Sequence, residues 1–188
     1  FTSFCANKRI TSKEFDVWMR LLKRIRGSVL WLYKSNQYAA ENLINEAEKR
    51  NVAVIMDADA LNLLTKLKLS SALPKRLILT PHPGEAATLL NTDVAVIEED
   101  RFKAASRIQK KFNATVVLKG SGTIICHKIN KVQKWGLCNA GNPGMAKGGM
   151  GDVLTGVIAG LLAQGLTLQE ASEAGVDLHA RAADQISS

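Results

Sequence analysis

The sequence predicts an α/β fold: a mostly parallel sheet with helices on both faces. Short apolar segments, typical of buried strands, alternate with amphipathic segments of helical spacing from residue 11 to residue 186. Several apolar segments also end directly in polar or glycine-rich loops, as strands do at the ligand-binding edge of an open α/β sheet. The 188 residues, 46% of them hydrophobic, are sufficient for one globular domain with its own core.

The first third of the chain contains the first strand–helix alternations. Residues Thr11 to Glu14 form a capping-box pattern, and apolar residues follow at helical spacing as far as Arg26. Asn36 is a suitable N-cap for a second helix. The strands and the third helix of this part are expected at residues 28–33, 52–56 and 59–67.

The same alternation continues to the end of the chain. The Thr80–Gly84 loop contains two prolines, which disfavour helix until Gly84 and Glu85 open the next one. The remaining elements are expected as strands 76–79 and 115–118, an amphipathic helix 98–112, a short antiparallel pair 123–127 and 132–135, and helices 152–163 and 168–186.

Composition excludes several kinds of protein. No apolar run approaches the roughly 20 residues of a membrane helix. The three cysteines, Cys5, Cys126 and Cys138, have no C-x-x-C spacing, so we expect free, mostly buried thiols, no metal site and a reducing, cytoplasmic setting. The net charge of +8 is interleaved with apolar helix positions, which indicates a solvated face, and no nucleic-acid motif is present.

The segment from Asn139 to Asp152 is the strongest functional signal. It has five glycines in 14 residues and leads directly into an apolar helix. Free amides at such a helix N-terminus favour an anion such as phosphate, and glycine lets the backbone approach it closely. Asp152 could accept the proton of a hydroxyl that attacks phosphorus, or it could be only the helix N-cap.

Three other strand ends carry weaker signals. Lys119-Gly120-Ser121-Gly122-Thr123 follows a buried strand and could be either a ligand loop or a tight hairpin turn. His82 lies between two prolines on a stiff loop, either as a site residue or as an idle surface histidine. Asp57 and Asp59 close another strand and could equally cap a helix. His127 and His179 are expected to be structural, without a ligand-spaced partner.

These motifs together resemble the ADP-dependent NAD(P)H-hydrate dehydratase family. The resemblance covers residues from about 52 to 188 and rests on the order and spacing of four segments. They are Met56–Leu64, Leu79–Ala86, Val117–Thr123 and Asn139–Asp152.

The resemblance implies a ribokinase-like fold and a lyase reaction that repairs nicotinamide nucleotides. ADP phosphorylates the hydroxyl of hydrated NADH or NADPH, and elimination of phosphate restores the ring double bond and leaves AMP. The residues that bind the nucleotide would be Lys119, Gly120, Ser121, Gly122, Thr123 and Gly151. His82 and Asp152 would contact the hydrate, with Asp152 as the catalytic base. Mg²⁺ often accompanies such phosphates, and family members often assemble into homo-oligomers.

Residues 1–52 do not fit this pattern. The family's longer first half, with a Gly-Pro-Gly-x-Gly segment, is absent, and the family is expected to continue past Ser188. Four segments instead resemble part of the catalytic region of O-linked N-acetylglucosamine transferases. They are Phe1–Phe4, the helix through Trp18, Ser28–Leu32 and Glu46–Val52. The sequence therefore predicts a chimera of a glycosyltransferase-like segment, 1–52, and a ribokinase-like segment, 53–188, packed as one domain.

The sequence leaves other functions open. The chain could be a non-catalytic α/β fragment that retains adenine-nucleotide binding, or another ribokinase-like small-molecule kinase. A glycosyltransferase is disfavoured, because likeness of fold does not confer a site. The His82 loop and the Lys119 loop together favour the dehydratase over another ribokinase-like kinase.

Overall fold

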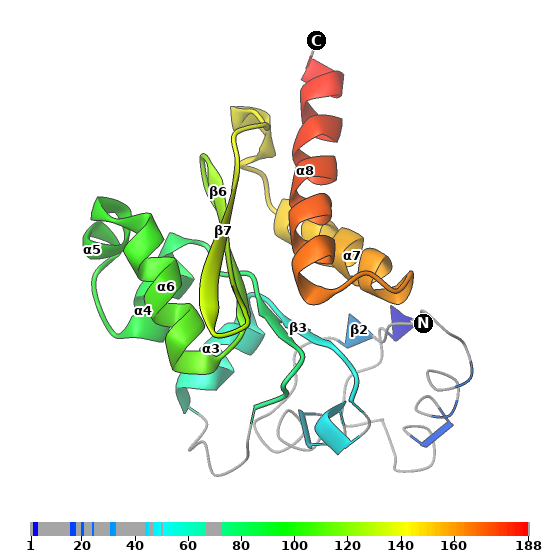
Figure 1. The fold of residues 1–188 in the computed structure, drawn as a ribbon. Helices are drawn as coiled ribbons and strands as arrows, with labels where there is room; N and C mark the ends of the chain where they lie inside the picture. Colours follow the sequence, from blue (N-terminus) through cyan, green and yellow to red (C-terminus); the bar gives the residue numbers. More distant parts are fainter. Residues whose placement is uncertain are drawn as a thin grey trace.

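The fold consists of a mixed five-stranded sheet with helices on both faces, beside a separate two-stranded sheet (Figure 1). The computed structural model describes residues 2–3, 16–17, 20, 24, 31–32, 44–45, 47–49, 51–66 and 73–187.

The larger sheet has the strand order β3-β4-β5-β6-β7. Its strands are β3 (Val54–Met56), β4 (Leu77–Leu79), β5 (Thr115–Leu118), β6 (Thr123–Ile129) and β7 (Val132–Cys138). The first three are parallel, and β6 and β7 extend the sheet as the expected antiparallel pair. The smaller sheet pairs β1 (Thr2–Ser3) with β2 (Trp31–Leu32) in parallel. The predicted α/β class is confirmed, but the larger sheet is mixed and not mostly parallel, because two of its four strand pairs are parallel and two are antiparallel.

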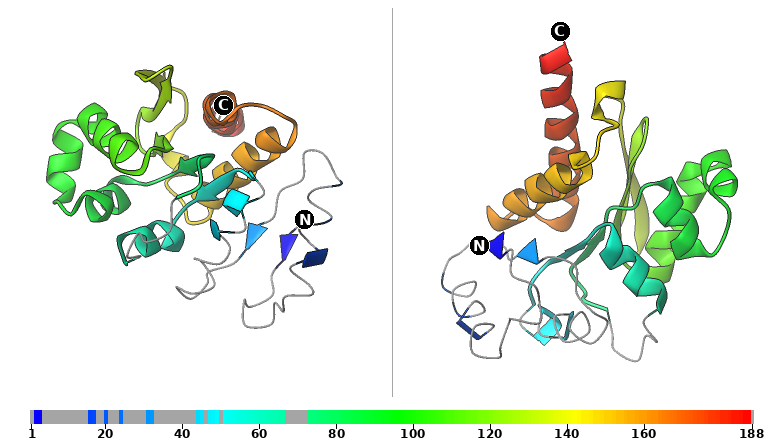
Figure 2. Two further views of the ribbon diagram at one scale, coloured as in Figure 1. Left: turned by 60° about the horizontal axis from the view of Figure 1, so that its bottom comes forward. Right: turned by 180° about the vertical axis from the view of Figure 1, so that it is seen from behind.

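Two groups of helices cover opposite faces of the larger sheet (Figure 2). Leu77 and Leu79 of β4 point to one face and Ile78 to the other, and all three are fully buried. Burial on both faces explains why the central strands are continuously apolar. One face packs against α3 (Asp59–Lys66), α4 (Pro83–Leu90), α5 (Val94–Glu99) and α6 (Arg101–Phe112), and the other against α7 (Met150–Ala163) and α8 (Leu168–Ser187).

The expectation of one helix over residues 98–112 is wrong. The chain leaves the helical conformation at Asp100, where φ is −147° and ψ is 85°, so α5 ends at Glu99 and α6 starts at Arg101. The Asp100 carboxylate accepts a hydrogen bond from the Lys103 amide at 2.8 Å. An aspartate that can cap a new helix competes with continuation of the previous one, which an amphipathic pattern does not reveal.

The predicted elements of the first 50 residues lie mostly outside the described residues. Residues 16, 17, 20 and 24 are helical, as expected within 11–26, and β2 lies within the expected strand 28–33. Residues 44–45 and 47–49 are helical, as expected after Asn36. Every helix in the described ranges is too short or too polar to serve as a membrane span.

Candidate active site

Three polar residues follow directly after the three parallel strands. Asp57 follows β3, Thr80 follows β4 and Lys119 follows β5. Because these strands are parallel neighbours, their carboxyl ends lie at one edge of the sheet, where open α/β sheets bind ligands. The fully buried Thr80 contributes to this edge by donating its hydroxyl to the Met56 carbonyl at 3.3 Å.

An ion pair connects the residues that follow β3 and β5. The ammonium of Lys119 lies 2.6 Å from one carboxylate oxygen of Asp57 and 3.7 Å from a carboxylate oxygen of Glu85. Thr155 of α7 donates its hydroxyl to the second oxygen of Asp57 at 3.0 Å. We call Asp57, Glu85, Lys119 and Thr155 the strand-end cluster. Asp57 is therefore an ion-pair partner in this cluster and does not serve only as a helix cap.

The surroundings of Asp57 stabilise its charged form. Burial raises the pKa of the carboxyl, but the charge of Lys119 and hydrogen bonds from Lys119, Thr80 and Thr155 outweigh it, so the pKa lies below its usual value. Only 12% of the Asp57 side chain and 20% of the Lys119 side chain are exposed. The pair is thus shielded enough to interact more strongly than a surface ion pair.

The N-terminus of α7 lies against this cluster. A Cβ atom at Gly151 would lie 3.4 Å from the Lys119 ammonium and 3.5 Å from a carboxylate oxygen of Asp57. Glycine therefore lets the helix backbone approach the ion pair closely. Thr155, one turn further along α7, contacts the same Asp57 carboxylate, so this side of the helix faces the strand ends.

Asp152 follows Gly151 in the first turn of α7. The N-cap is Gly149, at φ 90°, and no side chain caps the helix there. The interpretation of Asp152 as only an N-cap is therefore wrong. Asp152 is exposed and, with the residues the structure describes, its side chain forms no hydrogen bond or ion pair. Thr155 lies three positions after Asp152, and residues with this spacing are neighbours on one face of a helix.

His82 caps α4 and is not an idle surface residue. Its Nδ1 accepts hydrogen bonds from the amides of Gly84 at 3.0 Å and Glu85 at 3.3 Å, while the Glu85 carboxylate accepts from the His82 amide at 2.7 Å. This capping box fixes the loop, and through Glu85 it connects His82 to the strand-end cluster. The imidazole remains 56% exposed, and its Nε2 lies 3.5 Å from the Glu85 carboxylate.

The Lys119–Thr123 segment forms the turn between β5 and β6. Gly120 and Gly122 have φ values of 141° and 68°, which favour glycine. The Lys119 amide donates to the Pro81 carbonyl at 2.8 Å, so the turn lies beside the His82 loop. The segment is thus a hairpin turn, and it lies at the same edge of the sheet as the strand-end cluster. A hairpin turn in this position could also contact a ligand, so the two interpretations are compatible.

The glycine-rich loop is fixed at its start by α8. The carboxylate of Asp184 accepts hydrogen bonds from the Gly141 amide at 2.8 Å and from the Asn142 side chain at 3.1 Å. These bonds, the one from Gly141 foremost, lower the pKa of Asp184. Pro143–Met145 then forms the 3₁₀ turn η2, whose Gly144 amide donates to the Asn142 side chain. Further along, the exposed Gly148 and Gly149 have open space where a Cβ would be.

Sequence reasoning missed four residues of this arrangement. Glu85, Arg101, Thr155 and Asp184 each form polar contacts with a predicted site segment, and none stood out from its neighbours in the sequence. A carboxylate, a guanidinium or a hydroxyl on a helix has no local pattern that reveals a partner 17 or more residues away. Only the contact between Glu85 and His82 could have been predicted, because a glutamate three residues after an N-cap is typical of a capping box.

The other candidate groups remain outside the site. In the described ranges no three histidine, cysteine, aspartate or glutamate residues lie close enough together for a metal ion. Cys126 and Cys138 are free thiols, and burial raises the pKa of Cys126 to about 11, whereas Cys5 lies outside the described residues. His127 is 3% exposed, and burial lowers its pKa. A structural role for it is compatible with this position.

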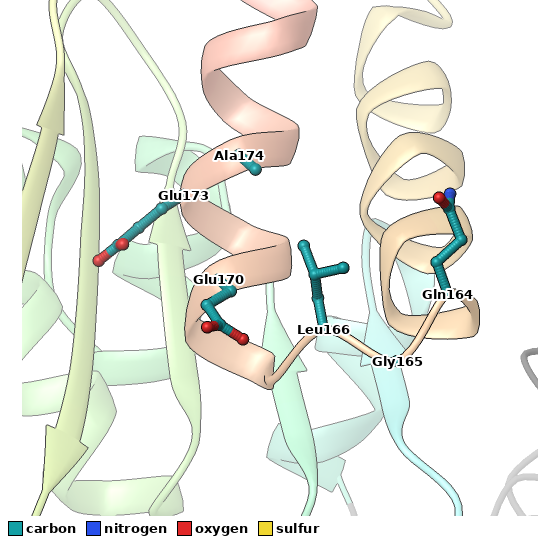
Figure 3. A pocket seen from close by; sticks show the side chains of 6 residues that line it. All are labelled: Gln164, Gly165, Leu166, Glu170, Glu173 and Ala174. Atoms are coloured by element: carbon teal, nitrogen blue, oxygen red, sulfur yellow. The ribbon is translucent and has the colours of Figure 1, made fainter.

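An open hollow of about 560 Å³ lies at the C-terminal end of α7 (Figure 3). Asp152 lies in the first turn of α7, at the opposite end of this helix. It is formed by the turn between α7 and α8 and the first turns of α8, with Glu170 and Glu173 at its border. Its lining residues are Gln164, Gly165, Leu166, Glu170, Glu173 and Ala174. None of them belongs to the strand-end cluster, and the polar contacts described above lie at the other edge of the sheet. The hollow therefore does not mark the candidate active site.

Known proteins resemble this chain over most of its length. The family model described as NAD(P)H-hydrate dehydratase matches residues 22–188. An ADP-dependent (S)-NAD(P)H-hydrate dehydratase of Neisseria meningitidis is 46% identical over 74% of this chain and 47% of its own length. A bifunctional NAD(P)H-hydrate repair enzyme of Leishmania major is 44% identical over 97% of this chain and 37% of its own. This chain spans less than half of the length of the curated relatives it matches.

A solved structure supports the same comparison. The ADP/ATP-dependent NAD(P)H-hydrate dehydratase of Bacillus subtilis, co-crystallised with ATP and Mg²⁺, superimposes with a TM-score of 0.69 at 29% identity. The match covers 84% of this chain and 54% of that protein. A ribokinase-like superfamily protein of Enterococcus faecalis superimposes with a TM-score of 0.74 at 28% identity, over 93% of this chain and 60% of that one. The ribokinase-like fold implied by the sequence resemblance is therefore confirmed.

The predicted chimera finds no support in these comparisons. The family model begins at residue 22, well before the expected boundary at 52, and the Leishmania major relative aligns with 97% of the chain. That alignment extends over 209 positions, more than the 188 residues present, so the relative has residues without counterpart here.

Proposed function

The chain belongs to the NAD(P)H-hydrate dehydratase family, and from this membership we propose that it catalyses the ADP-dependent dehydration of hydrated NADH or NADPH. The observation that supports this most is the position of Gly151, which brings the first turn of α7 against Lys119 and Asp57. Residues 62 and 94 positions apart in the sequence thereby form one site from the segments that carry the family resemblance.

The nucleotide is proposed to bind at the turn after β5 and the start of α7. Lys119, Gly120, Ser121, Gly122, Thr123 and Gly151 would form this part of the site. The relatives support ADP as the phosphoryl donor, since the Neisseria meningitidis protein is described as ADP-dependent. Mg²⁺ would accompany the nucleotide phosphates and neutralise part of their charge, as in the Bacillus subtilis protein crystallised with ATP and Mg²⁺.

Asp152 is proposed as the base and His82 as a second contact to the hydrate. The hydroxyl of the hydrate attacks the terminal phosphorus of ADP while its proton passes to the Asp152 carboxylate, and the bond between that phosphorus and the bridging oxygen breaks to release AMP. Loss of phosphate from the phosphorylated carbon, with loss of a ring proton, then restores the double bond. Free amides at the start of α7 stabilise the negative charge on the transferred group.

We propose a cytoplasmic location and a small-molecule substrate for this protein. Its partner is a small molecule, and the free thiols of Cys126 and Cys138 are compatible with a reducing, cytoplasmic setting. We also propose that the protein forms a homo-oligomer, because members of the family often do.

The test is an absorbance assay at 340 nm with purified NADH hydrate and ADP. We expect an ADP-dependent gain in absorbance, which Asp152→Asn reduces at least 100-fold, the usual scale for losing a general base. Binding of ADP by this variant, measured by calorimetry, should change less than threefold. Asp93→Asn is the matched control, since Asp93 is another exposed aspartate at a helix start and forms no side-chain cap.

The results separate the alternatives. Normal turnover by Asp152→Asn would contradict its role as base. Binding of ADP without any turnover by the unchanged chain would instead favour an adenine-nucleotide-binding protein without dehydratase activity.

A further inference from the structure

Arg101 is the first residue of α6, and its side chain is directed at the turn after β5. The guanidinium donates hydrogen bonds to the carbonyls of Leu118 at 3.3 Å and Lys119 at 3.1 Å, and also to the carbonyl of Ser121. Only 16% of the side chain is exposed. One cation thus binds three carbonyls within four consecutive residues, which fixes the direction of three peptide planes.

The turn packs closely against this guanidinium. A Cβ at Gly120 would lie 2.7 Å from Nη2 of Arg101, nearer than real side-chain contacts allow. The φ value of 141° at Gly120 is also one that other residues rarely adopt. Glycine at position 120 is therefore required for the contact with Arg101 as well as for the turn.

The direction of the carbonyls determines the direction of the amides. In a planar trans peptide the C=O of one residue and the N–H of the next point in opposite directions. The bond from Leu118 to Arg101 illustrates this, since the Lys119 amide points the other way and donates to the Pro81 carbonyl at 2.8 Å. By the same rule, the amides of Gly120 and Gly122 point away from Arg101.

These two amides have no acceptor within the described part of the chain. They follow Lys119, whose ammonium lies in the strand-end cluster, and they flank Ser121 in the segment proposed to bind the nucleotide. Gly120 is exposed and Gly122 is half-buried. Amides of a glycine-containing turn that lack a partner are suited to acceptor atoms of a ligand.

We infer that Arg101 is a positioning residue for the nucleotide: by binding the carbonyls of Leu118, Lys119 and Ser121 it directs the amides of Gly120 and Gly122 at acceptor atoms of the adenine nucleotide. This inference rests on the proposed function, which assigns the turn to ADP. Arg101 itself does not touch the ligand. A lysine at this position keeps the charge but has no planar fork to reach three carbonyls.

The test compares Arg101→Lys and Arg101→Gln with the matched variants Arg107→Lys and Arg107→Gln, whose arginine is exposed on the same helix. The amide signals of Gly120 and Gly122 are followed by NMR in the free proteins, and binding of ADP and of adenosine is measured by calorimetry. We expect both Arg101 variants to shift the two glycine signals and to bind ADP about tenfold more weakly. The Arg107 variants should resemble the unchanged chain.

The ligand series and the kinetics refine this result. An equal loss for ADP and adenosine would place the amides on the base or ribose, and a loss for ADP alone would place them on the phosphates. In the 340 nm assay, KM for ADP should rise about tenfold while kcat changes less than twofold, a pattern that general destabilisation would not produce.

Two outcomes would overturn the inference. Arg101→Lys could be folded and bind ADP as tightly as Arg107→Lys, or the glycine signals could remain unmoved in both Arg101 variants. A failure of the proposed function is recognised separately, because then the unchanged chain and the Arg107 variants would also fail to bind ADP.

Discussion

Replacing Gly151 by alanine should stabilise the fold and weaken the site at the same time. Gly151 is the second residue of α7, and its backbone does not require glycine, because its φ is not positive. Alanine is better than glycine in a helix by about 0.8–1 kcal/mol, and somewhat less near the end. For a chain of this size about 1 kcal/mol raises the melting temperature by about 2–4 °C.

The methyl group would occupy the space next to the ion pair. It would lie 3.4 Å from the Lys119 ammonium and 3.5 Å from the Asp57 carboxylate, which is close but tolerable contact. A nucleotide phosphate that approaches the start of α7 would meet this methyl instead of the helix backbone. We expect at least tenfold weaker binding of ADP, which corresponds to about 1.4 kcal/mol.

Gly160→Ala is the matched control for this variant. Gly160 lies in the interior of the same helix, and a Cβ there would have nothing within 4 Å. It should raise the melting temperature by a similar amount and leave ADP binding unchanged. Thermal unfolding followed by circular dichroism and calorimetric titration with ADP measure both quantities. If Gly151→Ala binds ADP as tightly as Gly160→Ala does, the reasoning about close approach at Gly151 is refuted.

Two further predictions concern stability. Gly175→Ala should lower the free energy of unfolding by about 1–3 kcal/mol, because a Cβ would lie 2.7 Å from Ile158 Cγ1, and an unchanged urea midpoint would contradict this close crossing of α7 and α8. Asp57→Asn should lower it by about 3 kcal/mol at pH 7, the low end for breaking a buried pair, since Glu85 still faces Lys119. The folded pKa of Asp57 lies below its ordinary 3.8, so its contribution is present above that pH and is lost as the pH falls through the folded value. Urea unfolding at pH 7 and pH 3 should therefore show a smaller difference at pH 3, and an equal difference would exclude the carboxylate as its source.

Much of the fold could be predicted because it depends on local patterns. Buried strands such as Thr115–Leu118 are short apolar runs, and helices such as α8 have regular apolar spacing, so both are readable without a partner. The boundary at Asp100 was not readable, because the same residue type occurs both inside amphipathic helices and as a cap. The comparisons do not support the predicted chimera, since the family model matches from residue 22 onward.

The sequence by itself determined which segments are candidates for binding and catalysis. The glycine-rich loop, the Lys119–Thr123 turn and the His82 loop are contiguous motifs whose residue types restrict what they can do. Only the tertiary structure decided how they meet. Parallel strands place Asp57 and Lys119 at one edge, α7 approaches them at Gly151, and Arg101 reaches the turn from a helix 17 to 20 residues earlier. The physical reason is that an ion pair or a hydrogen bond depends on distance in space, and strand order and helix packing bring these groups together with no trace in the local sequence.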